Sequence, residues 1–283
     1  MEKKIRPLLK WVGGKRQLIN SIIPLVPDTF STYVEPFIGG GALFFALEPK
    51  KAIINDYNEE LMNVYKVVRD NPEQLIEMLT VHKENFSKEY FYKVREYDRM
   101  INYNKLSNIK KAARFIFLNK TCFNGLYRVN LKGQFNTPIG NYVNPNIVNE
   151  TLIRDLSNYL NSNEITMNTG NYVDSLKNLD KNSFVYLDPP YAPISYTSSF
   201  TSYTDKGFTK KDQQILKKEC DKLIEQKIFF IQSNSDCEFI RNLYSEKDKY
   251  EYKIINVNAK RTINSNGQRR GNVQEVLISP KIK

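Results

Sequence analysis

The sequence has few of the residues that most metal sites and nucleophilic sites need. Its 283 residues include one histidine, His82, and three widely spaced cysteines, Cys122, Cys220 and Cys237. A single histidine argues against a Ser-His-Asp triad and against most histidine-based metal sites, and we expect His82 to lie on the surface of a helix. Three scattered cysteines indicate neither a disulfide framework nor a zinc site. The sequence therefore predicts free thiols and no bound metal.

Long apolar runs are lacking as well. No stretch approaches the ~18 apolar residues of a membrane span, and the N-terminus lacks the apolar region of a signal peptide. The 41% hydrophobic and 26% charged residues are typical of a globular protein. We therefore expect a cytoplasmic protein without a membrane partner.

Acidic residues are absent from one long interval of this basic chain, whose net charge is +11. Residues 99–149 contain eight Lys or Arg and no Asp or Glu, and residues 256–274 are also free of acids. The second interval carries Lys260, Arg261, Arg269 and Arg270. A solvated basic face is one interpretation. A polyanionic partner is the interpretation that we favour.

The stretch 183–191 carries the strongest chemical signal. The apolar run Phe184–Leu187 predicts a strand buried on both faces, and Pro189 and Pro190 must end it at Asp188. The Asp188 carboxylate and the Pro189 carbonyl can both accept hydrogen bonds from an amino group on a heteroaromatic ring, while Tyr191 can stack on that ring. The alternative is a proline-rich turn with a solvated aspartate.

Residues 33–58 form a second pattern, with strand 33–38, a turn at Gly39–Gly41, helix 42–47 and strand 52–54 followed by Asp56. Asp56 comes 17 positions after Gly39. An acid in this place is typical of nucleotide-binding folds, where it takes the ribose hydroxyls. Because the glycines do not follow the GxGxxG spacing, a ligand with an adenosine and no diphosphate is favoured over NAD.

Between these regions the pattern is first helical, from Glu60 to about Leu118, with a new helix at Pro72. Residues 122–140 then alternate on either side of Lys132-Gly133 and predict a β-hairpin. Arginine and asparagine alternate there with apolar residues, which suits contacts to base edges in a major groove. After Asn149 strands and helices alternate again, and strands 252–257 and 273–279 are expected to be antiparallel.

Four motifs in this order resemble the Dam-type DNA adenine-N6 methyltransferases: Lys10–Lys15, Phe37–Gly41, Asn55-Asp56 and Asp188–Tyr191. The resemblance covers almost the whole chain. It implies an α/β fold, a Rossmann-like class I methyltransferase sheet with an inserted, mainly helical DNA-recognition domain that carries a β-hairpin. The catalytic domain would comprise residues 1–58 and 146–283, and the recognition domain residues 59–145.

The resemblance also implies the chemistry: S-adenosylmethionine as cofactor, double-stranded DNA as partner, and a flipped adenine methylated at N6 by a bacterial or phage enzyme. Carried over by motif position, the catalytic residues are Asp188, Pro189, Pro190 and Tyr191. The cofactor site would contain Trp11, Gly13, Lys15, Glu35, Phe37, Gly39, Asp56, Tyr57, Asn171, Tyr172 and Asp188. The DNA contacts would be Lys10, Phe123, Asn124, Leu126, Arg128, Asn130, Pro138 and Tyr142.

The hairpin resembles that of members that methylate GATC. Of the assigned residues, Lys10 and Arg128 would contact guanines. One position departs from the family pattern, because Asn171 stands where an aspartate is usual. The sequence leaves open whether the enzyme works alone or beside a cognate restriction endonuclease.

Three alternatives remain. An amino-methyltransferase that acts on RNA or protein can share the Asp-Pro-Pro-Tyr motif, but the acid-free hairpin region argues against it. An inactive DNA-binding relative is disfavoured because Asp188, Pro189 and Tyr191 are all present. A nicotinamide-dependent oxidoreductase is disfavoured by the glycine spacing.

Overall fold

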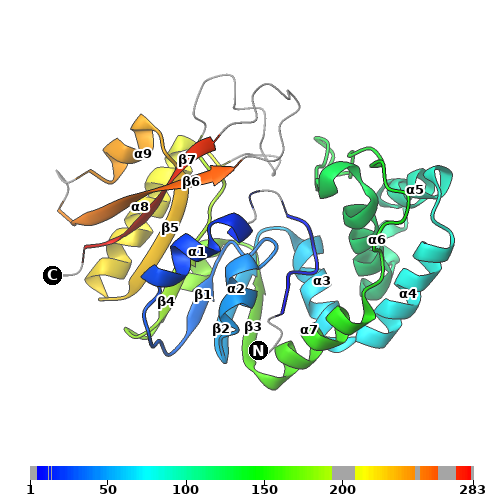
Figure 1. The fold of residues 1–283 in the computed structure, drawn as a ribbon, viewed down its shortest axis with the longest axis horizontal. Coiled ribbons are helices and arrows are strands. Elements are labelled where there is room, and N and C mark those ends of the chain that lie inside the picture. Colours follow the sequence, from blue (N-terminus) through cyan, green and yellow to red (C-terminus); the bar gives the residue numbers. More distant parts are fainter. Residues whose placement is uncertain are drawn as a thin grey trace. The chain divides into compact units, whose positions relative to one another are not determined.

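A computed structural model describes residues 5–11, 13, 15–192, 208–245, 249–260 and 272–281. The basic residues Arg261, Arg269 and Arg270 lie outside the described residues. Within the described ranges, seven strands form one mixed sheet in the order β3-β2-β1-β4-β5-β7-β6 (Figure 1). The strands are β1 Tyr33–Glu35, β2 Lys51–Asp56, β3 Glu164–Thr169, β4 Phe184–Leu187, β5 Phe229–Ser235, β6 Tyr252–Lys260 and β7 Asn272–Pro280. This arrangement confirms the Rossmann-like methyltransferase sheet.

The central strands are parallel and the last two are antiparallel. β1 pairs with β2 and β4, and β4 pairs with β5, all in parallel. β7 runs antiparallel to both β5 and β6, as expected for the last two strands. All four residues of β4 are buried, because its two faces are both covered. The strand ends at Leu187, so Asp188 is the first residue after it.

The helices within the described residues begin and end close to the expected positions. Pro72 is the first residue of α4, where its missing N–H costs nothing. Thr209 and Asp212 form a capping box at the start of α8. The helices are α1 Ile19–Ile22, α2 Ala42–Leu47, α3 Glu59–Asp70, α4 Pro72–Glu84, α5 Lys88–Arg95, α6 Asn108–Thr121, α7 Glu150–Ser162, α8 Lys210–Glu225 and α9 Glu238–Leu243.

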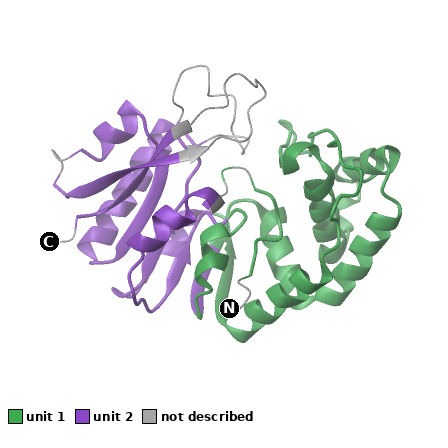
Figure 2. Cartoon of the chain, in the orientation of Figure 1, with its two compact units in different colours: residues 1–14, 39–50, 55–170 green, residues 15–38, 51–54, 171–283 purple. Residues whose placement is uncertain are grey.

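The chain divides into two compact units (Figure 2). Unit 1 comprises residues 1–14, 39–50 and 55–170, and unit 2 comprises residues 15–38, 51–54 and 171–283. In unit 2, apolar residues of α8, such as Leu216 and Leu223, share one core with β4 and β5. In unit 1, α3 and α4 both pack on α6, whose Phe115 and Phe117 are buried.

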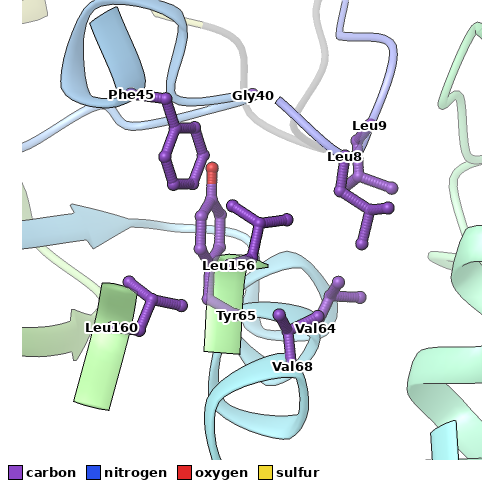
Figure 3. A pocket seen from close by; sticks show the side chains of 9 residues that line it. All are labelled: Leu8, Leu9, Gly40, Phe45, Val64, Tyr65, Val68, Leu156 and Leu160. Atoms are coloured by element: carbon purple, nitrogen blue, oxygen red, sulfur yellow. The ribbon is translucent and has the colours of Figure 1, made fainter. Parts of the chain in front are cut away.

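A small apolar cavity lies inside unit 1. Its volume is about 20 Å³, and its lining includes Leu8, Phe45, Tyr65 and Leu156 (Figure 3). A cavity of this volume has room for about one water molecule, and its lining offers few polar partners. The cavity is therefore too small to hold a nucleoside.

His82 is not a surface residue, so that expectation was wrong. It lies on α4 with 5% of its surface exposed, and its ring stacks on Phe117 with centroids 4.9 Å apart. Its Nδ1 forms a 2.9 Å hydrogen bond with the Tyr90 hydroxyl. Burial lowers the pKa of His82 to about 4, so the ring is neutral at pH 7. The polar neighbours of His82 in the sequence concealed its apolar environment.

Residues 122–140 fold back on themselves as expected, but they form isolated β-bridges and not two continuous paired strands. Isolated antiparallel bridges join Cys122 to Ile139 and Val129 to Phe135. The turn is closed by the Asn130 side chain, whose Oδ1 accepts hydrogen bonds from the N–H groups of Lys132 and Gln134. We call residues 122–140 the hairpin segment.

No helix within the described ranges is long and apolar enough to cross a membrane. In the same part of the chain, no group of three or more His, Cys, Asp or Glu side chains is placed to hold a metal ion. The three cysteines are free thiols, and Cys122 and Cys220 are buried.

Candidate active site

Unit 2 brings the Asp188–Tyr191 motif together with Lys15. The Lys15 ammonium lies 2.9 Å from Asp188 Oδ1 and 4.3 Å from the centroid of the Tyr191 ring. Only 6% of the Lys15 surface is exposed. Lys15 was expected in the cofactor site, and here its ammonium pairs with the Asp188 carboxylate.

A second group orients Asp188. The Ser233 hydroxyl, near the end of β5, donates a 3.0 Å hydrogen bond to the same Oδ1 and is 3.0 Å from the Tyr186 hydroxyl. Among the described residues, Asp188 Oδ2 accepts no hydrogen bond. One oxygen is thus fixed by the protein, and the other can accept a hydrogen bond from a ligand.

The charge of Asp188 is set by two opposing effects. Burial raises the pKa of the Asp188 carboxyl above its usual value, and the Lys15 ammonium lowers it. The net shift is upward, so Asp188 is a better proton acceptor than an exposed aspartate. A carboxylate with this property at a strand end is a candidate for catalysis.

The backbone after Asp188 is held by two buried amides. Gln213 Nε2, on α8, donates to the Pro190 carbonyl at 2.9 Å, and Asn234 Oδ1, on β5, accepts from the Ala192 N–H at 3.2 Å. The two amides also bond to each other at 3.0 Å, and neither is exposed. Because the network is buried and paired, it fixes the loop around Tyr191 in one conformation.

Tyr191 is tethered at its hydroxyl. The hydroxyl donates a 2.6 Å hydrogen bond to Glu275 Oε2 on β7. Burial, followed by the charges of Asp188 and Glu275, raises the pKa of Tyr191 well above its usual range, so the hydroxyl remains a donor. Glu275 was not expected at this site.

Unit 1 brings the glycine turn and Asp56 together. Asp56 Oδ2 accepts a 3.0 Å hydrogen bond from the Gly39 N–H, and Oδ1 accepts a 2.9 Å bond from the Asn58 N–H. Burial raises the pKa of the Asp56 carboxyl, and these backbone donors lower it. A carboxylate oxygen has two lone pairs, so both oxygens can still accept a hydrogen bond from a hydroxyl.

Gly39 adopts the left-handed region, with φ +47°. A Cβ at this position would lie 2.6 Å from the Trp11 ring, so the close approach of Trp11 requires glycine here. Trp11 also stacks on Tyr127 of the hairpin segment, with ring centroids 5.7 Å apart. Trp11 thus contacts both the glycine turn and the hairpin segment.

The remaining cofactor candidates have separate surroundings. In unit 2, buried Glu35 accepts a hydrogen bond from the Tyr33 hydroxyl, and the Phe37 and Tyr172 rings lie 4.9 Å apart. Asn171 Oδ1 accepts from the Val173 N–H, so the residue that departs from the family pattern caps a short helix. In unit 1, Tyr57 is 71% exposed next to Asp56, and Gly13 has φ +77°.

The DNA candidates Lys10 and Tyr142 are neighbours in unit 1. Lys10 Nζ donates to the Tyr142 hydroxyl at 3.3 Å. The backbone of Lys10 is held by the buried Asn119 side chain, which accepts from its N–H and donates to its carbonyl. Asn119 also donates to the Gly125 carbonyl, so it joins Lys10 to the start of the hairpin segment.

The other DNA candidates lie along the hairpin segment. Phe123 is half-exposed, Asn124 has φ +56°, and Leu126 is partly buried. The exposed Arg128 donates to Asn136 Oδ1 at 2.7 Å. Pro138 is exposed, and its carbonyl accepts from the Phe123 N–H, whereas Asn130 closes the turn. Lys132 at the turn is also exposed.

Not every basic residue of the acid-free interval is available to a partner. Arg114 is buried, and its guanidinium lies 2.7 Å from Asp98. Arg99 also pairs with Asp98. A count of charges in the sequence therefore overestimates the basic surface.

Five residues at these positions were missed: Ser233, Asn234 and Glu275 on strands, and Gln213 and Asn119 on helices. The polar run at the end of β5 was a signal for the first two, since polar groups at strand ends often face ligands. The other three make contacts that are distant in sequence, so no local pattern indicated them.

Comparison with known proteins places the chain in a family. Residues 11–263 match the D12 class N6 adenine-specific DNA methyltransferases. Type II methyltransferase M1.LlaDCHI of Lactococcus lactis subsp. cremoris is 45% identical over 276 residues, which cover 97% of this chain and 95% of that protein. Type II methyltransferase M.MjaIII of Methanocaldococcus jannaschii is 42% identical over 293 residues, covering 97% and 99%. DNA adenine methylase of Serratia marcescens is 33% identical over 279 residues, covering 97% and 98%.

These matches extend over almost the whole chain and include both the glycine turn and the Asp188 motif. The resemblance noted in the sequence is thereby confirmed. The chain belongs to the D12 class of N6 adenine-specific DNA methyltransferases.

Proposed function

We propose that this enzyme transfers the methyl group of S-adenosylmethionine to N6 of an adenine flipped out of double-stranded DNA, within the sequence GATC. The observation that carries the chemistry is the Asp188 carboxylate. It follows β4 directly, Lys15 and Ser233 fix its Oδ1, and Oδ2 accepts no hydrogen bond among the described residues. This arrangement suits an acceptor for the adenine amino group.

The protein's part in the reaction is to orient and polarise that amine. Asp188 Oδ2 and the Pro189 carbonyl accept its two N–H groups, which localises the lone pair on N6. Tyr191 stacks on the base and aligns it. N6 forms the bond to the methyl carbon, the bond from that carbon to sulfur breaks, and Asp188 takes the proton that N6 loses.

S-adenosylmethionine supplies an electrophilic methyl group on a positively charged sulfur. Asp56 fits its ribose, because both carboxylate oxygens are held by backbone N–H groups and can each accept a hydroxyl hydrogen bond. Tyr57 offers an exposed ring face next to Asp56 for the adenine of the cofactor. Trp11, Gly13, Lys15, Glu35, Phe37, Gly39, Asn171 and Tyr172 complete the proposed cofactor residues.

We assign DNA recognition to residues 59–145, inserted in the catalytic domain of residues 1–58 and 146–283. Exposed Lys10 and Arg128 are proposed to contact guanines, and Leu126 and Pro138 to contact the central bases. Phe123 and Asn124 are proposed to fill the space that the flipped adenine leaves, with Asn130 and Tyr142 supporting the segment. The exposed basic residues support a DNA partner.

The deciding experiment is transfer of a labelled methyl group to two duplexes that differ only in GATC or GTTC, with the modified nucleoside identified. We expect N6-methyladenine in the first duplex alone. Methylation of both would retain the chemistry and reject GATC. Transfer to RNA or protein, and to neither duplex, would reject the DNA substrate.

Asp188→Ala is expected to reduce the transfer rate by about 10²-fold or more, because the amine loses both its acceptor and its orientation. Cofactor affinity, measured by calorimetry, should change little, since Asp56 is unaltered. A variant with the activity of the unmodified enzyme would contradict the proposed role of Asp188.

Arg128→Ala is expected to cost about 1–3 kcal/mol of discrimination at one guanine of the site. Relative rates on GATC and on duplexes with one substituted base pair measure this cost. Lys93→Ala, on α5, is the control for loss of one positive charge from unit 1. If all duplexes slowed equally, Arg128 would be a phosphate contact instead.

We further propose that the enzyme acts in the cytoplasm, where its DNA substrate lies, and that a cognate restriction endonuclease can accompany it. Two of the relatives are named type II methyltransferases. Methylated and unmethylated plasmid, challenged with the endonuclease of the same strain, would test this partnership.

A further inference from the structure

The Tyr191 side chain is held at two points in unit 2. Its hydroxyl donates to Glu275 Oε2 at 2.6 Å, and the Lys15 ammonium lies 4.3 Å from the centre of its ring. A hydrogen bond from a neutral hydroxyl to a carboxylate is short and stronger than one between neutral groups. Because the hydroxyl oxygen lies on the axis about which the ring rotates, this bond fixes the position of the far end of the side chain, while the Lys15 ammonium lies over the face of the ring.

We propose that Glu275 is a positioning residue that holds the far end of the Tyr191 side chain at the place where its ring stacks on the acceptor adenine. This inference rests on the proposed function and extends it to a residue on β7. Stacking requires the ring to lie directly over the base, and a tyrosine whose hydroxyl has no partner can move to another staggered χ1 rotamer, which carries its ring away from the base.

The backbone and the side chain of Tyr191 are held by different groups. Gln213 and Asn234 bind the backbone on either side of it, at Pro190 and Ala192. These hydrogen bonds are to the backbone, so they do not fix where the far end of the side chain lies. The Glu275 bond supplies the missing constraint at the far end of the side chain.

The position of Glu275 is well defined because β7 has a paired strand on each side. Its backbone is paired with Ser235 of β5 on one side and with Val257 of β6 on the other. Strands paired on both edges move little, so the carboxylate has a defined position. Gln274, the preceding residue, is exposed, and its side chain points to the opposite face of the sheet.

The test uses Glu275→Ala, Glu275→Gln, Tyr191→Phe and the double variant Glu275→Ala/Tyr191→Phe, with Gln274→Ala as the matched control. Single-turnover rates, KM for duplex and cofactor, and thermal midpoints are measured for each protein. Glu275→Ala and Tyr191→Phe should each slow methyl transfer about tenfold, because each removes the same charged hydrogen bond. KM for the cofactor should stay within about twofold of the unmodified enzyme.

Two comparisons separate positioning from a structural role. The double variant should be no slower than either single variant, since both changes delete one interaction. Glu275→Gln keeps an acceptor for the hydroxyl and should recover activity to within about threefold of the unmodified enzyme. Tyr191→Phe removes one oxygen and keeps the ring, so the comparison survives if Glu275→Ala folds poorly.

Each contrary result has a distinct meaning. If the unmodified enzyme methylates DNA and Glu275→Ala does so at the same rate, the inference about Glu275 is overturned. The proposed function is then unaffected. Losses that multiply in the double variant would show that Glu275 acts other than through the Tyr191 hydroxyl, and would also overturn it. Unmodified enzyme without transfer to any adenine duplex would overturn the proposed function and this inference with it.

Discussion

Lys15 and Asp188 form a buried ion pair, in which two opposing effects act on the pKa of the Asp188 carboxyl. Burial favours the neutral carboxyl, and the neighbouring ammonium favours the charged one. The proposed acceptor role of Asp188 requires the charged form. Lys15 therefore keeps Asp188 ionised at a lower pH than burial alone would allow.

Lys15→Met is expected to move the acid limb of the pH–rate profile to higher pH. In the unmodified enzyme, transfer should be lost as the pH falls through the raised pKa of Asp188. Without the ammonium that pKa rises further, so the loss begins earlier on acidification. Single-turnover rates at saturating cofactor, from about pH 5 to about pH 9, measure the limb.

Lys177→Met is the control, because Lys177 pairs with the exposed Asp174. Its profile should match that of the unmodified enzyme. An acid limb in the same place for Lys15→Met would show that the ammonium does not set the charge of Asp188.

Among the elements, α6 connects two segments that are far apart in sequence. Its Asn119, 1% exposed, bonds to the N–H and the carbonyl of Lys10 and to the carbonyl of Gly125. One side chain thus fixes both the Lys10 segment and the start of the hairpin segment. Both segments carry proposed DNA contacts.

Asn119→Ala should lower the free energy of unfolding by about 1–3 kcal/mol, because it leaves buried backbone groups without partners. It should also weaken binding to a GATC duplex, since Lys10 and the hairpin segment lose their common support. Urea unfolding and fluorescence anisotropy measure the two effects.

The exposed Asn158→Ala on α7 is the control, and we expect its stability to change by less than about 0.5 kcal/mol. Unaltered duplex affinity in Asn119→Ala would mean that the two segments are supported elsewhere.

The free energy of unfolding is a property of the whole molecule. It depends on pH in part through the single histidine, His82. The pKa of His82 is lowered to about 4 by burial, whereas an unfolded histidine titrates near pH 6.5. Between these values the unfolded chain binds a proton that the folded chain does not. Stability contributed by neutral His82 is therefore lost as the pH falls through this window.

His82→Gln is expected to remove this part of the pH dependence. Between pH 7.5 and pH 5, the free energy of unfolding of the unmodified protein should fall by about 1–2 kcal/mol more than that of the variant. Urea titrations at the two pH values give the difference, in which contributions from the carboxyl groups cancel. Equal losses in the two proteins would show that His82 gains its proton without unfolding.

The sequence by itself determined the order of the elements and the ends of those that matter most. The apolar run Phe184–Leu187 specified a buried strand, and two prolines after Asp188 specified its end, because proline has no N–H for a ladder. Pro72 and the Thr209–Asp212 capping box marked helix starts in the same local way. Interactions within a few residues decided these features, so a local pattern was sufficient.

Only the tertiary structure decided which side chains meet. Glu275 lies 84 residues from Tyr191, and Lys15, near the start of the sequence, pairs with Asp188 about two thirds of the way along it. His82 was expected at the surface, and Arg114 was counted with the basic residues of the acid-free interval, but packing against α6 buries His82 and packing of α6 itself buries Arg114. Burial and long-range hydrogen bonds depend on how elements pack together, and that packing depends on apolar surface contributed by the whole chain.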